Sequence, residues 1–155
     1  MTKAAIGKKM PAFSLESTAG ALSNKDLAGK PTLLYFYPRD DTPGCTLEGR
    51  EFTALHPKFK RAGIAVYGVS RDTLVKHERF KTKYAFPFDL IADPEEKLCE
   101  AFGVMKDKNL YGKKVRGIER STFLFDADGA LRAEWRKVKP EGHAEAMLKA
   151  AKDLD

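Results

Sequence analysis

The stretch YFYPRDDTPGCTLEGREF, residues 35–52, marks a change from a strand to a helix. The run that leads into it, residues 32–37, is apolar on both faces, which is typical of a central strand covered on both sides. Pro38 breaks that run, and from Pro43 to about Ala62 the apolar residues fall on one helical stripe. The stretch therefore predicts a buried strand, a polar loop and a long helix.

Further elements are predicted on both sides of this stretch. Residues 12–16 alternate between apolar and polar and meet a turn, which predicts an N-terminal β-hairpin. A short helical turn is expected at residues 23–27. The remaining predicted strands are residues 64–70, 88–91, 120–125 and 131–138, and the remaining helices are residues 73–84, 94–102 and 143–154. The order β-α-β-α, then a β-hairpin, then a helix predicts an α/β fold with a central mixed β-sheet flanked by helices. Thioredoxin-like folds have this order.

Length and composition set limits on the class of protein. The chain has 155 residues, 43% hydrophobic and 32% charged, which suits a single globular domain over residues 1–155. No run approaches the ~18 apolar residues of a membrane helix. The beginning, MTKAAIGKKMPAF, lacks the apolar segment of a secretory signal. We therefore expect a cytoplasmic protein with no membrane partner.

The charge and the metal-binding residue types suggest few partners. A net charge of +6 could indicate a nucleic-acid partner, but the densest basic stretch, KDKNLYGKKVR at 106–116, reads as a solvated loop. We expect no nucleic-acid binding, and infer that the charge favours a thiolate or attracts small anionic thiols. Two cysteines and three scattered histidines do not form a zinc-ligand pattern, so we expect no metal and no cofactor.

Cys45 lies at the beginning of the long predicted helix. Thr42 suits the N-cap and Pro43 the first helical position, so Cys45 falls in the first turn. There its sulfur faces unpaired backbone N–H groups and the positive end of the helix dipole, which both favour the nucleophilic thiolate. Cys99, beside the apolar face of its own predicted helix, is interpreted as a packing residue.

The pattern Pro38-x-x-x-Thr42-x-x-Cys45 resembles that of a peroxiredoxin. The longer stretch, residues 35–52, resembles the PrxQ branch, also called bacterioferritin comigratory protein. Three later segments also resemble this branch: residues 68–72, 85–88 and 111–123. The resemblance implies a thioredoxin-like fold and a thiol-dependent peroxidase that reduces hydrogen peroxide and organic hydroperoxides, in antioxidant defence and cell redox homeostasis. It also implies a monomer.

The resemblance assigns a role to each matching residue. Cys45 would be the peroxidatic cysteine, whose thiolate attacks the terminal oxygen of a peroxide and becomes sulfenic acid. Thr42 would accept a hydrogen bond from the backbone near Cys45 and donate its own to the peroxide. Pro38 would shield the sulfur from water, and Arg120 would hold a permanent positive charge beside sulfur and substrate. Glu48 could pair with an arginine, but we interpret it as an exposed residue near the helix start.

The chain departs from the family at the resolving cysteine. The two usual positions hold Arg50 and Lys81. We therefore expect a one-cysteine mechanism, in which an external thiol (thioredoxin, glutaredoxin or a small thiol) reduces the sulfenic acid. The alternative is an intramolecular disulfide between Cys45 and Cys99. That bond needs Cα atoms within ~7 Å and therefore a movement of the helix that carries Cys99.

Two other functions remain open at this point. A thioredoxin-like disulfide oxidoreductase normally needs Cys-x-x-Cys, whereas this chain has Thr42-x-x-Cys45. A redox sensor or non-enzymatic binding module could use Cys45 as a switch. Such a module would react slowly with peroxide and change conformation on oxidation.

Overall fold

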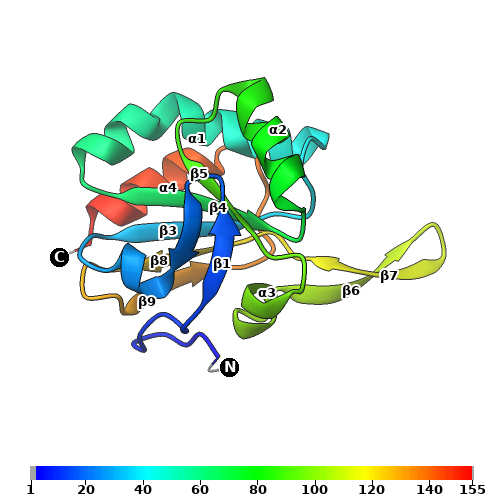
Figure 1. Cartoon of the computed structure of the whole chain (residues 1–155), viewed down its shortest axis with the longest axis horizontal. Helices are drawn as coiled ribbons and strands as arrows, with labels where there is room; N and C mark the ends of the chain where they lie inside the picture. Colours follow the sequence, from blue (N-terminus) through cyan, green and yellow to red (C-terminus); the bar gives the residue numbers. More distant parts are fainter. Residues whose placement is uncertain (1–2, 155) are drawn as a thin grey trace.

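The computed structural model describes residues 3–154, and a mixed β-sheet forms its centre (Figure 1). Seven strands lie in the order β2-β1-β5-β4-β3-β8-β9. Their bounds are β1 (Ser14–Ser17), β2 (Gly20–Ser23), β3 (Thr32–Phe36), β4 (Ala65–Ser70), β5 (Asp89–Ala92), β8 (Ser121–Phe125) and β9 (Leu131–Trp135). Strands β3, β4 and β5 are parallel, while β8, β9 and the N-terminal hairpin pair antiparallel. The predicted mixed sheet and N-terminal hairpin are confirmed.

Helices cover both faces of this sheet (Figure 1). They are α1 (Pro43–Arg61), α2 (Leu74–Tyr84), α3 (Lys97–Ala101) and α4 (His143–Lys152), with a 3₁₀ turn, η1, at Asn24–Leu27. Helices α1, α2 and α4 lie on one face and the short α3 lies on the other. Among residues 3–154, none of these helices combines the length and apolarity that a membrane crossing requires.

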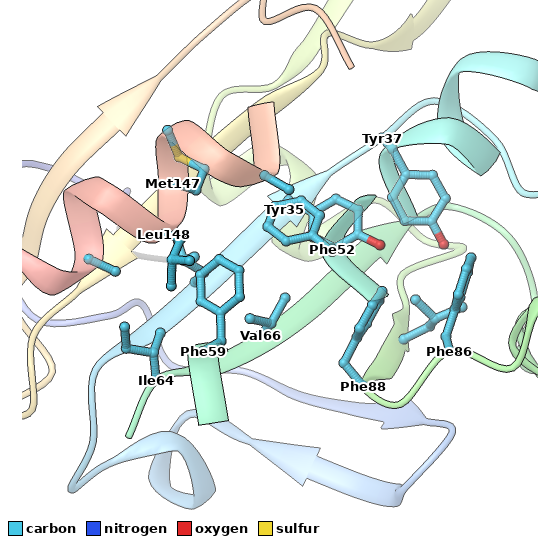
Figure 2. Packing of buried hydrophobic residues seen from close by; sticks show 14 of the residues in the cluster. Tyr35, Tyr37, Phe52, Phe59, Ile64, Val66, Phe86, Phe88, Met147 and Leu148 are labelled. Carbon is cyan, nitrogen blue, oxygen red and sulfur yellow. The ribbon is translucent and has the colours of Figure 1, made fainter. Parts of the chain in front are cut away.

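Strand β3 supplies side chains to both hydrophobic cores. Its five residues are all buried, as its two-sided apolar pattern predicts. Leu33 and Tyr35 point into the core beneath α1 and α4, and Leu34 and Phe36 into the core on the side of α3. Figure 2 shows the first core, where the rings of Tyr35 and Phe52 stack with centroids 4.6 Å apart. The strand that precedes the functional loop is therefore fixed from both faces.

The prediction of a solvated loop at 106–116 was wrong. Strands β6 (Met105–Leu110) and β7 (Lys113–Ile118) form an antiparallel hairpin that extends from the body of the molecule (Figure 1). Tyr111 and Gly112 both adopt positive φ (53° and 77°), which is the backbone of a two-residue hairpin turn. Strand prediction relies on one buried face, and most of this hairpin is exposed, so the sequence carries little signal.

Two predicted elements are shorter than expected, for reasons in the backbone. Helix α3 begins at Lys97 rather than Pro94, because Glu96 adopts a left-handed φ of 62° before it. Strand β9 ends at Trp135 rather than Val138, because Lys137 adopts a left-handed φ of 54°. The N–H of Val138 then turns back to the carbonyl oxygen of Arg120, 3.0 Å away.

The close packing around Gly68 in β4 can be tested by its effect on stability. Gly68 pairs with Tyr35 on one side and Leu90 on the other. A Cβ on Gly68 would lie 2.8 Å from Leu90 Cδ2 and 3.0 Å from the Tyr35 ring. We expect Gly68→Ala to lower the free energy of unfolding by about 1–3 kcal/mol, measured by urea denaturation, because the packed neighbours must move.

A matched control uses a glycine on the exposed hairpin. A Cβ on Gly117, in β7, would have no atom within 4 Å. Gly117→Ala should therefore change stability by less than about 0.5 kcal/mol. Equal losses in the two variants would show that the loss at Gly68 does not come from crowding.

Candidate active site

Cys45 lies in the first turn of α1, directly after the loop that follows β3. Thr42 is the N-cap residue, with an extended backbone (φ −98°, ψ 156°), and Pro43 begins the helix, as the sequence predicts. Cys45 is only 2% exposed and belongs to the core beneath α1 and α4. The sulfur is buried because the first turn of α1 packs its inner face against the sheet.

Arg120 comes from a distant part of the chain to the sulfur of Cys45. It immediately precedes β8, and the antiparallel pairing of β8 with β3 brings it to the end of β3. Its Nη2 donates to Cys45 Sγ at 3.4 Å. Gly44 leaves room for this approach, since a Cβ there would lie 3.1 Å from Nη2. The guanidinium places a permanent positive charge where a thiolate would form.

Glu48 completes this cluster, and its interpretation as an exposed residue was wrong. The side chain is fully buried, and its Oε1 accepts from Arg120 Nη1 at 2.6 Å. Residues three apart on a helix share a face, so the spacing from Cys45 to Glu48 was the available signal. Since a buried charge needs a partner, the carboxyl of Glu48 and the guanidinium of Arg120 hold each other in place.

The protonation of Glu48 is set mainly by burial. Burial raises the pKa of Glu48 to about 7 from an ordinary 4.5, although the charge of Arg120 opposes this rise. Glu48 Oε2 has no hydrogen-bond partner among residues 3–154, which also favours a proton on this carboxyl. Nearby, burial foremost and then the charge of Arg120 lower the pKa of His143 to about 4, so His143 is neutral. Near neutral pH, the carboxyl of Glu48 therefore changes charge beside Arg120.

Thr42 does not make the hydrogen bond that the resemblance implies. Its Oγ1 donates to the carbonyl oxygen of Arg39 at 2.9 Å, and it accepts no bond from the first turn of α1. The hydroxyl instead closes the short loop before the helix. Pro38 lies at the beginning of that loop, half-buried, and lines a surface hollow together with Arg120. Contact of Thr42 with a peroxide and shielding of the sulfur by Pro38 stay predictions.

A hydrogen-bonded network that the sequence does not indicate supports the loop from behind. The Asp40 carboxylate accepts from the Tyr37 hydroxyl at 2.6 Å and lies 2.7 Å from His77 Nδ1. The Asp40 N–H donates to Asp72 at 2.9 Å, and His77 Nε2 donates to the carbonyl oxygen of Ile91 at 2.9 Å. Asp40, Asp72 and His77 have metal-ligand types within 4.8 Å of one another. Both His77 nitrogens hold protein partners, so we interpret the cluster as a support for the loop.

A second set of bonds ties the loop to α2. Asp41 adopts a left-handed φ of 58°, and its carboxylate accepts from Lys83 at 2.7 Å and from Tyr84 at 2.6 Å. At one of the usual resolving positions, Lys81 donates to the carbonyl oxygens of Phe86 and Phe88. These bonds hold the C-terminal end of α2 and the segment that follows it.

Cys99 lies on the opposite side of the sheet from Cys45. It is fully buried in the core of α3, whereas Cys45 belongs to the core of α1 and α4. The backbone N–H of Cys99 donates to Asp93 at 2.7 Å. Burial foremost, and then the Asp93 carboxylate, raise the pKa of the Cys99 thiol far above its ordinary value. Cys99 therefore has neither the position nor the ionisation of a nucleophile facing Cys45.

Comparison with known proteins identifies the class first. Residues 6–134 match the model of the AhpC/TSA family, so the chain belongs to that family. Relatives then give the branch. The chain is 54% identical over 125 residues to "Peroxiredoxin Bcp" of Xanthomonas campestris pv. campestris, covering 81% of this chain and 78% of that protein. It is 46% identical over 150 residues to "Peroxiredoxin Bcp" of Bacillus subtilis, covering 96% of each.

Solved structures agree with this placement. PrxQ of Xylella fastidiosa has a TM-score of 0.90 at 38% identity and covers 98% of each chain. The Xanthomonas campestris bacterioferritin comigratory protein has a TM-score of 0.86 at 48% identity and covers 90% of each chain. That work concerns the alkyl peroxide reduction activity of the Xanthomonas protein. The predicted thioredoxin-like fold and the resemblance to PrxQ are confirmed, and the chain is a peroxiredoxin, a thiol-dependent peroxidase.

The raised pKa of Glu48 can be tested by the pH dependence of the free energy of unfolding. The unfolded state keeps a pKa near 4.5, and the folded state has one of about 7, so the folded state binds more protons between these values. The free energy of unfolding of the wild type should therefore fall as pH rises from 4.5 to 7, relative to Glu48→Gln, and level off above 7. Urea denaturation of both proteins at pH 5, 6, 7 and 8 measures this difference.

The control for this series is an exposed carboxyl. Glu16 lies on the surface of β1, so Glu16→Gln should show a difference from the wild type that is nearly flat over the same pH range. A wild-type curve that rises relative to Glu48→Gln would show that the ion pair with Arg120 outweighs burial.

Proposed function

We propose that this peroxiredoxin reduces hydrogen peroxide and organic hydroperoxides at Cys45, and that an external thiol completes each cycle. The observation that carries the proposal is the Arg120 guanidinium, 3.4 Å from the Cys45 sulfur and held by buried Glu48. Such a charge stabilises both the attacking thiolate and the negative charge that develops on the peroxide. The relatives' names and the alkyl peroxide work on the Xanthomonas protein support the same reaction.

The oxidative step needs the sulfur, one peroxide and a proton. The Cys45 thiolate attacks the terminal peroxide oxygen, so that an S–O bond forms and the O–O bond breaks. The sulfur becomes sulfenic acid, and the leaving oxygen takes a proton from solvent to become water or an alcohol. We propose that Arg120 faces the leaving oxygen as it becomes negative, that Thr42 turns its hydroxyl toward the peroxide, and that Pro38 limits water.

The reductive step favours a one-cysteine mechanism. The usual resolving positions carry Arg50 and Lys81, and Cys99 lies across the sheet in a separate core. A disulfide between Cys45 and Cys99 would require α3 to leave that core, since Cα atoms must come within ~7 Å. We therefore propose that thioredoxin, glutaredoxin or a small thiol reduces the sulfenic acid directly. A monomeric state and a cytoplasmic location belong to the same proposal.

The test treats fully reduced protein with one equivalent of hydrogen peroxide, without thiol, in the presence of a sulfenic-acid trapping reagent. Peptide mass analysis should find the trapped group on Cys45 while Cys99 remains available for alkylation after unfolding. A Cys45–Cys99 disulfide would replace the one-cysteine mechanism by the intramolecular one. An unmodified Cys45 after minutes would favour a redox sensor or binding module.

Two serine variants separate the cysteines by activity. Cys45→Ser should lower thiol-dependent peroxide consumption by at least about a thousandfold, because the nucleophile is lost. Cys99→Ser should keep the rate within about threefold of the wild-type rate, because this substitution alters only the packing of the core around α3. Peroxide consumption with an excess of small thiol measures both variants. A loss in Cys99→Ser as large as that in Cys45→Ser would make Cys99 part of the cycle.

A further inference from the structure

A hollow of about 420 Å³ adjoins the sulfur site on the side of the hairpin β6–β7. Arg120 lines it, and the same guanidinium donates to Cys45 Sγ. Its remaining lining residues are Pro38, Lys106, Asp107, Lys108, Glu119, Lys137 and Val138. Arg120 therefore contacts the buried sulfur and also lines a hollow that holds lysines which the peroxide chemistry does not use.

Two of the lysines that line this hollow have no charged or hydrogen-bonding partner among residues 3–154. The ammonium groups of Lys106 and Lys137 make no hydrogen bond or ion pair with other groups in residues 3–154, and both side chains are exposed. Lys108 donates to the carbonyl oxygen of Ile118. Two carboxylates, Asp107 and Glu119, also line the hollow, so its four cationic side chains leave an excess of positive charge.

The lysines that line the hollow come from β6 and from the turn after β9. Lys106, Asp107 and Lys108 are consecutive on β6, and all three line the hollow. Asp107 pairs across the hairpin with Arg116, which bonds Glu96 at 3.2 Å and so ties the hairpin to the beginning of α3. Lys137 adopts a left-handed φ of 54°, a conformation that a lysine rarely takes and that is common at functional sites. The next residue, Val138, bonds the Arg120 backbone.

We propose that this hollow binds the carboxylate of a small anionic thiol, which reduces the Cys45 sulfenic acid. The inference rests on the proposed one-cysteine function and names the class of its reductant. The thiol sulfur attacks the sulfenic sulfur, so that an S–S bond forms, the S–O bond breaks and the hydroxyl leaves as water. A second thiol attacks the sulfur of the bound thiol, which restores the Cys45 thiolate and releases the reductant as its disulfide. Two thiols supply the two electrons.

The first experiment measures attraction of a carboxylate without any peroxide chemistry. Reduced Cys45 is alkylated with iodoacetate and, separately, with iodoacetamide, which differ by the carboxylate alone. The ratio of the two rates should fall about three- to tenfold in the double variant Lys106→Gln/Lys137→Gln, because this variant lacks two positive charges that attract the carboxylate. In the control variant Lys30→Gln, with an exposed lysine just before β3, the ratio should stay at the wild-type value. An unchanged ratio in the double variant would overturn the proposal.

The second experiment measures the reductive step itself. Protein carrying the sulfenic acid is mixed with thioglycolate, which is anionic, or 2-mercaptoethanol, which is neutral, and the rates of reduction are compared. The thioglycolate to 2-mercaptoethanol ratio should fall about three- to tenfold in the double variant, and high salt should reduce the difference between variant and wild type. The Lys30→Gln ratio should match the wild type. Equal ratios in all three proteins would overturn the proposal.

A third pair of rates tests whether the hollow binds the carboxylate of the thiol reductant or that of a peroxide substrate. The oxidation of Cys45 is measured with a carboxylate-bearing organic hydroperoxide and with tert-butyl hydroperoxide. A loss in the double variant with the charged hydroperoxide, with no fall in the thioglycolate to 2-mercaptoethanol ratio, would overturn the assignment to a thiol. Failure of the wild type to form any sulfenic acid would contradict the proposed function instead, and the alkylation ratio would still decide whether the hollow attracts a carboxylate.

Discussion

One guanidinium, that of Arg120, is shared between the buried carboxyl of Glu48 and the sulfur of Cys45. An unpaired charge at this depth would be costly, so each member of the group requires the others. Two separate pieces of the chain therefore have to meet: the first turns of α1, which carry Cys45 and Glu48, and the residue directly before β8. The pairing of β8 with β3 makes this meeting a property of the sheet.

The strength with which Arg120 acts on the sulfur depends on whether Glu48 is ionised. When Glu48 carries a proton, the guanidinium is free to stabilise negative charge on the sulfur or on a departing oxygen. When Glu48 is ionised, it competes for that charge. Because burial raises the pKa of Glu48 to about 7, the balance between these two states lies near neutral pH. The proposed action of Arg120 on the sulfur is therefore expected to vary with the ionisation of Glu48.

Local patterns in the sequence were enough to predict the strand β3, the beginning of α1 and the position of Cys45 within it. They failed where position depends on distant contacts. Glu48 resembles any surface glutamate until β8 brings Arg120 beside it, and His77 gives no sign that it lies behind the loop of Asp40. The hairpin β6–β7 was missed for a different reason, since neither of its faces is buried enough to leave a pattern. Arg120 itself was placed only through resemblance to a family.

The bonds of Lys81 to the carbonyl oxygens of Phe86 and Phe88 have a consequence for evolution of this chain. A cysteine at that position would have to leave its helix in each cycle to reach the peroxidatic sulfur, and any gain in rigidity there would slow turnover. In the proposed one-cysteine mechanism the reductant arrives from outside, so turnover would not depend on α2 opening. Under that mechanism, substitutions that stabilise α2 would carry no cost in rate, so the usual trade-off between stability and activity would not apply to this helix.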